Sequence, residues 1–286
     1  MQLRRKRFSL KLPDRTLRLG ERTLIMGVLN VTPDSFSDAG RYLDVDRAVE
    51  RASEIEREGA DILDIGAEST RPGSRRVPFE EELHRLVPVL ERLKGRISIP
   101  ISVDTYKSEV ALRALKLGAG MLNDISGGRW DPRMYDVARR HRVPMVLMHM
   151  RGDPQSWKHL SPRRAVVQFV LKELRGMIER ARESGIARRQ ILIDPGFGFG
   201  KDAAENVRIL SRLEDLACLK APVCIGTSRK SFLGKVLQRP VTDRLLGSAA
   251  TVAIAVLKGV HIVRVHDVAE SVEVVRVADA ILNQRI

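Results

Sequence analysis

Eight short runs of aliphatic and β-branched residues recur along the chain, and each is followed by a polar turn and a segment with apolar residues at helical spacing. The runs do not alternate between apolar and polar residues, which is typical of strands buried on both faces of a parallel sheet. The predicted strands are residues 23–29, 61–65, 99–103, 121–122, 144–148, 191–193, 223–226 and 261–265. The predicted helices are residues 46–58, 80–93, 107–117, 134–141, 162–184, 204–213, 242–258 and 268–282. Strand and helix therefore alternate throughout.

Eight strand–helix units in one series favour a closed (β/α)8 barrel, the TIM-barrel architecture of the α/β class, over an open doubly wound sheet. Such a barrel takes roughly 250 residues as a single unit, and this chain has 286. No Ser- or Pro-rich linker interrupts the series. We therefore expect one domain over residues 1–286, with a short basic extension at residues 1–20 in which residues 4–7 form a solvated arm.

The composition adds charge to this picture. Lys and Arg number 50 against 36 Asp and Glu, a formal charge of +14, which suits an anionic partner such as nucleic acid or a phosphorylated metabolite without choosing between them. The basic amino terminus lacks the apolar run of a secretory signal, and no stretch of about 18 apolar residues could span a membrane. We therefore expect a cytoplasmic protein.

Polar residues close every predicted strand, at the end where barrels of this kind carry their catalytic groups. These residues are Asn30, Glu68, Asp104, Asn123, Asp124, His149, Asp194, Ser228, Lys230, Arg264 and His266. Any one of them alone is explained by the start of a loop. The joint pattern of amides, carboxylates and cations on one rim favours a small-molecule site.

Asp104 and Asp194 each follow buried aliphatic residues, where an ionised carboxylate is costly unless it is paired or hydrogen-bonded. A carboxylate accepts two parallel N–H bonds from a flat amidine-like edge, such as that of a 2-amino-4-oxo-pyrimidine ring. Asn123 and Lys230 could serve the remaining polar groups of such a ring. The structural alternative for each aspartate is a helix N-cap or a bond to a neighbouring loop.

The rim also carries cations, namely Arg71, Arg229, Lys230, Arg264 and His266. Arginine binds phosphate oxygens in bidentate fashion, which suits a diphosphate leaving group. In so basic a chain a single Arg is more often a surface residue. Arg264 and His266 are two residues apart on a strand and so share a face, which favours a common ligand.

Residues 196–201 (GFGFGK) look like a phosphate loop, but their spacing fits neither GxxxxGK[ST] nor GxGxxG, and they are interpreted as a flexible turn. The histidines include no HExxH pair, so no all-protein metal cage is predicted. A Mg²⁺ ion held mainly by substrate phosphates and water needs few protein ligands, and Asn30 could supply one.

Taken together, these segments resemble the dihydropteroate synthases. The matching motifs are residues 30–40 (NVTPDSFSDAG), 68–73 (ESTRPG), 102–107 (SVDTYK), 123–125 (NDI), 147–150 (LMHM), 194–201 (DPGFGFGK), 228–231 (SRKS) and 264–268 (RVHDV). The resemblance implies a homodimeric (β/α)8 barrel that condenses 4-aminobenzoate with 6-hydroxymethyl-7,8-dihydropterin diphosphate. Its products are diphosphate and 7,8-dihydropteroate for folate synthesis, and sulfonamides compete with the aminobenzoate. Ala67 and Ala39 depart from the family pattern, which usually has Gly at both positions.

The resemblance also implies roles for the matched residues. The implied pterin pocket comprises Asp104, Asn123, Met148, Asp194 and Lys230. The implied diphosphate site comprises Asn30, Thr70, Arg71, Arg264 and His266, with Asn30 also binding Mg²⁺. The implied aminobenzoate side comprises Phe36, Thr70, Pro72, Phe199 and Ser228. Asp38 lies with Phe36 on a first loop that closes over this side, and the implied catalytic set is Asn30, Asp38, Arg71, Lys230, Arg264 and His266.

The chemistry of these groups suggests a dissociative, SN1-like step as a hypothesis. Cations and Mg²⁺ stabilise the departing diphosphate, and the ring with its anchoring carboxylates tolerates the developing positive charge. The arylamine is already a nucleophile, so the enzyme mainly positions it and excludes water.

Three other functions are weighed against this one. A methyltetrahydrofolate methyltransferase resembles the family in fold and in its pterin-binding carboxylates, but it has no use for ESTRPG or SRKS. A basic nucleic-acid-binding protein would interleave its cations with exposed aromatic residues, which make up 4% of this chain. A non-catalytic homologue would be expected to lose loop residues, and Asp38, Arg71 and Lys230 are intact.

Overall fold

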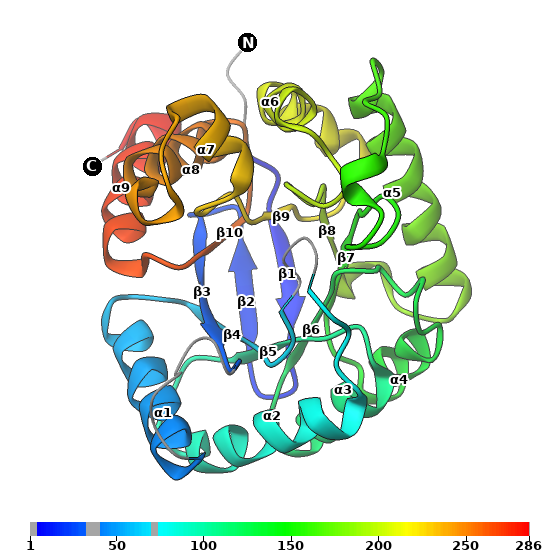
Figure 1. The fold of residues 1–286 in the computed structure, drawn as a ribbon, viewed down its shortest axis with the longest axis vertical. Helices are drawn as coiled ribbons and strands as arrows, with labels where there is room; N and C mark the ends of the chain where they lie inside the picture. The colour runs from blue at the N-terminus through cyan, green and yellow to red at the C-terminus, as the bar shows by residue number, and fades with distance from the viewer. Residues whose placement is uncertain (1–4, 33–40, 70–73, 286) are drawn as a thin grey trace.

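A computed structural model describes residues 5–32, 41–69 and 74–285, and it forms a barrel of eight parallel strands surrounded by helices (Figure 1). The barrel strands are β3 (Leu24–Asn30), β4 (Ile62–Gly66), β5 (Ile101–Asp104), β6 (Met121–Asp124), β7 (Met145–Met148), β8 (Ile191–Asp194), β9 (Cys224–Ile225) and β10 (Ile262–Val265). The α-helices are α1 (Arg41–Arg57), α2 (Phe79–Leu93), α3 (Ser108–Lys116), α4 (Arg133–His141), α5 (Val166–Glu183), α6 (Ala203–Ser211), α7 (Ser231–Leu237), α8 (Leu245–Leu257) and α9 (Val268–Asn283). The predicted (β/α)8 barrel is confirmed.

The strands are hydrogen-bonded in the order β8-β7-β6-β5-β4-β3-β10-β9. A parallel bridge between Ile193 and Val223 joins the two ends of this series. The N–H of Ile193 donates to the carbonyl of Pro222 at 3.0 Å across the same seam. The barrel is therefore closed, and its backbone pairing is least extensive between β8 and β9.

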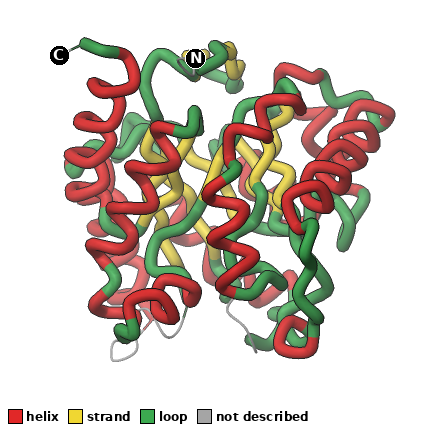
Figure 2. The backbone as a smooth tube through the Cα atoms, turned by 90° about the horizontal axis from the view of Figure 1, so that it is seen from above, coloured by secondary structure: helices red, strands yellow, loops and turns green. Residues whose placement is uncertain are grey.

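The main hydrophobic core lies between the barrel strands and the helices that surround them. Figure 2 shows the backbone of these helices around the strands. Leu63 and Ile65 of β4 belong to this core together with Leu86 and Val89 of α2, and all four are fully buried. Alternate residues of each strand point to opposite faces, so the other set points into the barrel. Within the described residues, none of the helices is long and apolar enough to cross a bilayer.

A β-hairpin covers the N-terminal end of the barrel. Strands β1 (Phe8–Lys11) and β2 (Thr16–Leu19) pair antiparallel, and Leu10 and Leu19 lie on the face toward the barrel. They pack on buried residues at this end of the barrel strands, which are Leu24, Met26, Ile62, Met121, Val146, Leu192, Cys224 and Ile262. Residues 5–20 of the predicted basic extension are thus part of the fold, because their alternating leucines cover an apolar barrel end that would otherwise face water.

The prediction of a solvated arm at residues 4–7 is wrong for Arg5. The Arg5 side chain is 2% exposed, and its Nη2 donates to Oδ1 of Asp279 in α9 at 2.7 Å. The neighbouring Arg7 side chain is 75% exposed, as predicted. The buried ion pair ties the start of the described chain to its last helix.

Helix α7 was not predicted from the sequence. Its seven residues include Gly234, and a short segment with glycine gives no clear helical periodicity. The strand predicted at residues 121–122 extends to Asp124, where polar residues continue the ladder with β5 and β7.

Candidate active site

A polar layer lies inside the barrel above the apolar layer that the hairpin covers. On several strands the residue two positions after an apolar inward residue is polar: Asp64 follows Ile62, Asn123 follows Met121, Asp194 follows Leu192 and Arg264 follows Ile262. The strand register sets Asp104 beside Asn123 and Met148 beside Asp194. The predicted convergence of Asp104, Asn123, Asp194 and Arg264 on one rim is therefore observed.

Arg264 occupies the centre of this layer. Its Nε donates to Oδ2 of Asp64 at 2.6 Å, and its Nη2 donates to Oδ2 of Asp104 at 2.7 Å. Asn123 donates from Nδ2 to the same Asp64 oxygen at 3.0 Å. The sequence predicts that Arg264 binds a phosphate, whereas in the structure two of its nitrogens donate to carboxylates.

Sequence reasoning missed Asp64, which has no exposed surface. The signal was an aspartate inside the apolar run ILDIG, where a carboxylate is costly unless it meets a cation. Its Oδ1 is buried and has no hydrogen-bond partner among the described residues. Asp64 therefore orients both Arg264 and Asn123 from below.

The electrostatics of the layer follow from burial. Burial raises the pKa of Asp104 above its usual value, and the charge of Arg264 opposes this shift. Burial also raises the pKa of Asp194 to about 6, although the N–H of Gly196 donates to its Oδ1 at 2.6 Å. The pKa of Lys230 falls to about 8, because burial and the charge of Arg264 outweigh the two aspartates. A ligand that donates N–H bonds to these carboxylates would favour their ionised forms.

An apolar wall stands beside the polar layer. It is a cluster of five buried residues, Tyr106, Ile125, Met148, Met150 and Phe199, flanked by Trp130 and Trp157. The Lys230 ammonium lies 4.1 Å from the centre of the Phe199 ring. Polar groups on one side and flat apolar surfaces on the other suit an aromatic heterocycle.

His266 lies at the same rim next to Ser228. The ring Nδ1 and the Ser228 Oγ are 3.1 Å apart, and the backbone N–H of His266 donates to the same Oγ at 3.3 Å. Burial, together with the charges of Arg264 and Lys230, lowers the pKa of His266 to about 3. The imidazole is therefore neutral near pH 7, so it offers a hydrogen bond and not the positive charge that the sequence suggested.

The chain matches the family model described as pterin binding enzyme over residues 26–266. It belongs to that family. It is 45% identical to the dihydropteroate synthase of Bacillus subtilis over 92% of this chain and 90% of the relative. It is also 42% identical to the enzyme of that name from Escherichia coli, over 91% of this chain and 92% of the relative.

Solved structures of this pterin-binding family agree with the fold. A dihydropteroate synthase from Xanthomonas albilineans with 4-aminobenzoic acid superposes with a TM-score of 0.90 at 44% identity, covering 96% of this chain and 98% of that one. A Yersinia pestis dihydropteroate synthase in a sulfonamide drug complex also gives 0.90, at 40% identity, covering 96% of this chain and 100% of that one.

Some polar strand ends of this pterin-binding enzyme hold loops and are not part of the polar layer. Glu68 accepts from the Tyr106 hydroxyl at 2.9 Å and pairs with Lys107, while Asp124 accepts from the N–H groups of Ser126 and Gly128, both at 2.7 Å. For these two carboxylates, the explanation that a polar residue marks the start of a loop is correct.

Five predicted site residues lie outside the described residues, and their roles stay predictions: Phe36, Asp38, Thr70, Arg71 and Pro72. Asn30 is described. It is half-buried at the end of β3, in register with Gly66 of β4.

The fit of a metal ion can be judged from the donors. Among the described residues, no group of three or more His, Cys, Asp or Glu could hold a metal ion. The side chain of Asn30 supplies a neutral oxygen at the rim, which fits a Mg²⁺ ion whose other ligands are phosphate and water.

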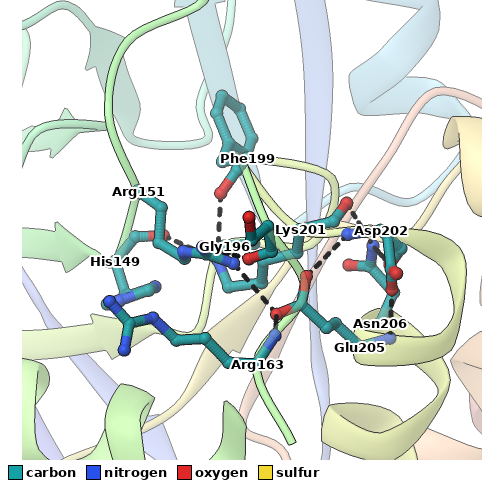
Figure 3. Close-up of polar contacts among 10 residues, drawn as sticks. His149, Arg151, Arg163, Gly196, Phe199, Lys201, Asp202, Glu205 and Asn206 are labelled. Carbon is teal, nitrogen blue, oxygen red and sulfur yellow. Dashed lines mark hydrogen bonds and ion pairs between the residues drawn. The ribbon is translucent and has the colours of Figure 1, made fainter. Parts of the chain in front are cut away.

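The interpretation of residues 196–201 as a flexible turn is wrong. Lys201 is buried and its Nζ donates to backbone carbonyls of this loop and of the end of β7 (Figure 3). A Cβ at Gly196 would lie 1.9 Å from the carbonyl oxygen of His149, so the glycine allows a close backbone approach. The loop is a packed part of the site.

Proposed function

We propose that this enzyme is a dihydropteroate synthase that joins 4-aminobenzoate to 6-hydroxymethyl-7,8-dihydropterin diphosphate. The observation that carries the proposal is the layer of Asp104, Asn123, Asp194 and Arg264 beside the wall formed by Met148 and Phe199. Carboxylates and an amide beside flat apolar surfaces match the polar edge and the two faces of a pterin. Relatives solved with 4-aminobenzoic acid and with 7,8-dihydropteroate support the same substrates.

The two aspartates would hold the pterin edge. Arg264 takes one oxygen of Asp104 and Gly196 takes one oxygen of Asp194, which leaves the second oxygen of each for N–H donors of the ring. Burial raises the pKa of both aspartates and so disfavours their ionised forms, and N–H donors of the ring would stabilise these ionised forms. Asp64 keeps Arg264 and Asn123 oriented and does not touch the ring.

The diphosphate would lie at the rim toward Asn30, Lys230 and His266, with the predicted Thr70 and Arg71. A bound Mg²⁺, held by Asn30 and the phosphates, would neutralise part of the leaving group's charge. Lys230 supplies a cation from the protein, and His266 donates or accepts a hydrogen bond. The buried aspartates tolerate positive charge on the pterin carbon, so we propose a dissociative step in which C–O cleavage runs ahead of attack by the amine.

The decisive experiment measures diphosphate release by the purified protein with pterin diphosphate and Mg²⁺, with and without 4-aminobenzoate. We expect turnover with both substrates, competitive inhibition by a sulfonamide and loss of turnover on chelation. A folded protein that releases no diphosphate with both substrates would exclude the proposed activity. Positional oxygen exchange within the diphosphate before amine addition tests the dissociative step, and cleavage that always waits for the amine would contradict it.

We also propose a homodimer formed through the last helices. Leu246 and Ile254 of α8 and Val277 and Ile281 of α9 are exposed, and Leu246 is 83% exposed. These two helices pack on one another in the described structure, so a second copy is a suitable cover for their outer apolar side chains. A cytoplasmic location stays a prediction from the sequence.

A further inference from the structure

The loop between β8 and α6 is built around the Lys201 ammonium. Its Nζ donates to the carbonyl of Gly196 at 2.7 Å and to those of His149 and Phe199 at 3.2 Å each. An ammonium has three donors, and here all three meet backbone oxygens. Lys201 is 8% exposed, so the contacts are shielded from water.

The backbone at this loop is pressed against the end of β7. Gly196 and Gly200 both have φ of +67°, and a Cβ at Gly200 would lie 2.3 Å from the carbonyl oxygen of Arg151. Three carbonyl oxygens that point at one buried position repel one another unless a donor or cation lies between them. The ammonium of Lys201 meets this requirement.

A second buried charge holds the far side of the loop. Glu205 accepts from Nη1 of Arg151 at 2.9 Å and from the N–H groups of Arg163 and Asp202 at 2.8 Å each (Figure 3). Asp202 accepts in turn from the N–H of Glu205 and caps α6. The loop is therefore fixed to α6 independently of Lys201, which confines the effect of Lys201 to residues 194–199.

Those residues carry two groups of the proposed site. Gly196, whose carbonyl Lys201 binds, donates its N–H to Asp194. Phe199, whose carbonyl Lys201 also binds, places its ring 4.1 Å from the Lys230 ammonium and 5.3 Å, edge to face, from the Trp157 ring. The positions of the Asp194 carboxylate and of the Phe199 ring thus depend on one buried amine.

We propose that Lys201 is a positioning residue, whose ammonium ties the carbonyls of His149, Gly196 and Phe199 and so sets the Phe199 ring and the Asp194 carboxylate in the site. The proposal rests on the proposed synthase function for its kinetic consequence. Lys201 does not act as the lysine of a phosphate loop, because its donors are occupied by the protein backbone.

The kinetic test compares Lys201→Met with Lys172→Met, a matched change at an exposed position of α5. We expect Lys201→Met to raise KM for 4-aminobenzoate by about 10- to 100-fold, since misplacement of about 1 Å is enough for such a loss, and Lys172→Met to leave it unchanged. In a double-mutant cycle with Phe199→Leu, the two fold-changes should not multiply, because both variants lose the same ring position. Fold-changes that multiply, or an unchanged KM in Lys201→Met, would overturn the proposal.

A second readout does not need turnover. In a Trp130→Phe background, Trp157 is the single tryptophan and reports the Phe199 ring, so Lys201→Met and the milder Lys201→Gln should shift its emission while Lys172→Met should not. An unchanged spectrum in folded Lys201→Gln would contradict the positioning role. If the parent protein shows no turnover, the synthase function fails, and this spectrum still decides the role of Lys201.

Discussion

Arg264 donates from Nε to Oδ2 of Asp64 at 2.6 Å, and Asp64 is fully buried beneath the proposed pterin site. The pair fixes the guanidinium whose other branch reaches Asp104. Asp64→Asn keeps the shape but leaves Arg264 with one carboxylate, and removing one partner of a buried pair typically costs about 3–5 kcal/mol. We expect lower stability by urea unfolding, and kcat/KM for the pterin substrate reduced about 100-fold by misorientation. Asp136→Asn, on the exposed side of α4, is the control and should match the parent.

The ion pair between Arg5 and Asp279 should be a major contribution to stability. Asp279 also accepts from the N–H of Thr23 at 2.6 Å, so Arg5→Ala leaves a buried carboxylate without its cation. We expect a loss of about 3–5 kcal/mol in the free energy of unfolding, measured by urea denaturation. Arg7→Ala is the control, because it removes an exposed arginine two positions further along the chain and should have little effect. Equal losses in the two variants would show that burial of Arg5 is unimportant.

His261 should make stability depend on pH. Its Nδ1 accepts from the N–H of Val223 at 3.1 Å and its Nε2 lies 2.9 Å from the carbonyl of Lys6, so the neutral ring fits both partners. Burial lowers the pKa of His261 to about 4 from 6.5. Between these values the unfolded chain binds a proton that the folded chain does not, so stability falls as pH falls, by about 1.4 kcal/mol per pH unit.

The measurement is urea unfolding at several pH values between 4.5 and 7.5. His261→Gln should lose that part of the slope, whereas His141→Gln, at an exposed position of α4, should keep it. A parent and a His261→Gln variant with parallel pH profiles would exclude this origin.

Leu246→Lys should convert the proposed dimer to a monomer. The side chain is exposed on α8, and a charge there would be buried without a partner in the assembly. Light scattering after gel filtration should show half the parent mass. Val207→Lys, at an exposed apolar position of α6 and so outside the two helices of the proposed interface, should keep the parent mass. A parent that is already monomeric would remove the proposal.

The sequence predicted the barrel and most of its rim because both follow short-range rules. Buried parallel strands are recognisable as apolar runs, and Asp104, Asp194 and Arg264 interrupt or close such runs. The partners were not predictable in this way, because the bond between Asp64 and Arg264 joins residues 200 positions apart.

Two other features escaped for related reasons. The charges of the amino-terminal residues predict a basic extension, whereas the alternating leucines of hairpin β1–β2 are the signal for its packing on the barrel. Glycine spacing alone predicts a flexible turn at residues 196–201, because it does not reveal that the carbonyl of His149, directly after β7, meets the amine of Lys201.

The hairpin and the Arg5–Asp279 pair bring the two ends of the described chain to the closed end of the barrel, opposite the polar layer. A second domain fused at either terminus would therefore begin at the end remote from the substrates. Architecture of this kind allows modules to be gained or lost in evolution, or tags to be added in the laboratory, without obstructing the chemistry.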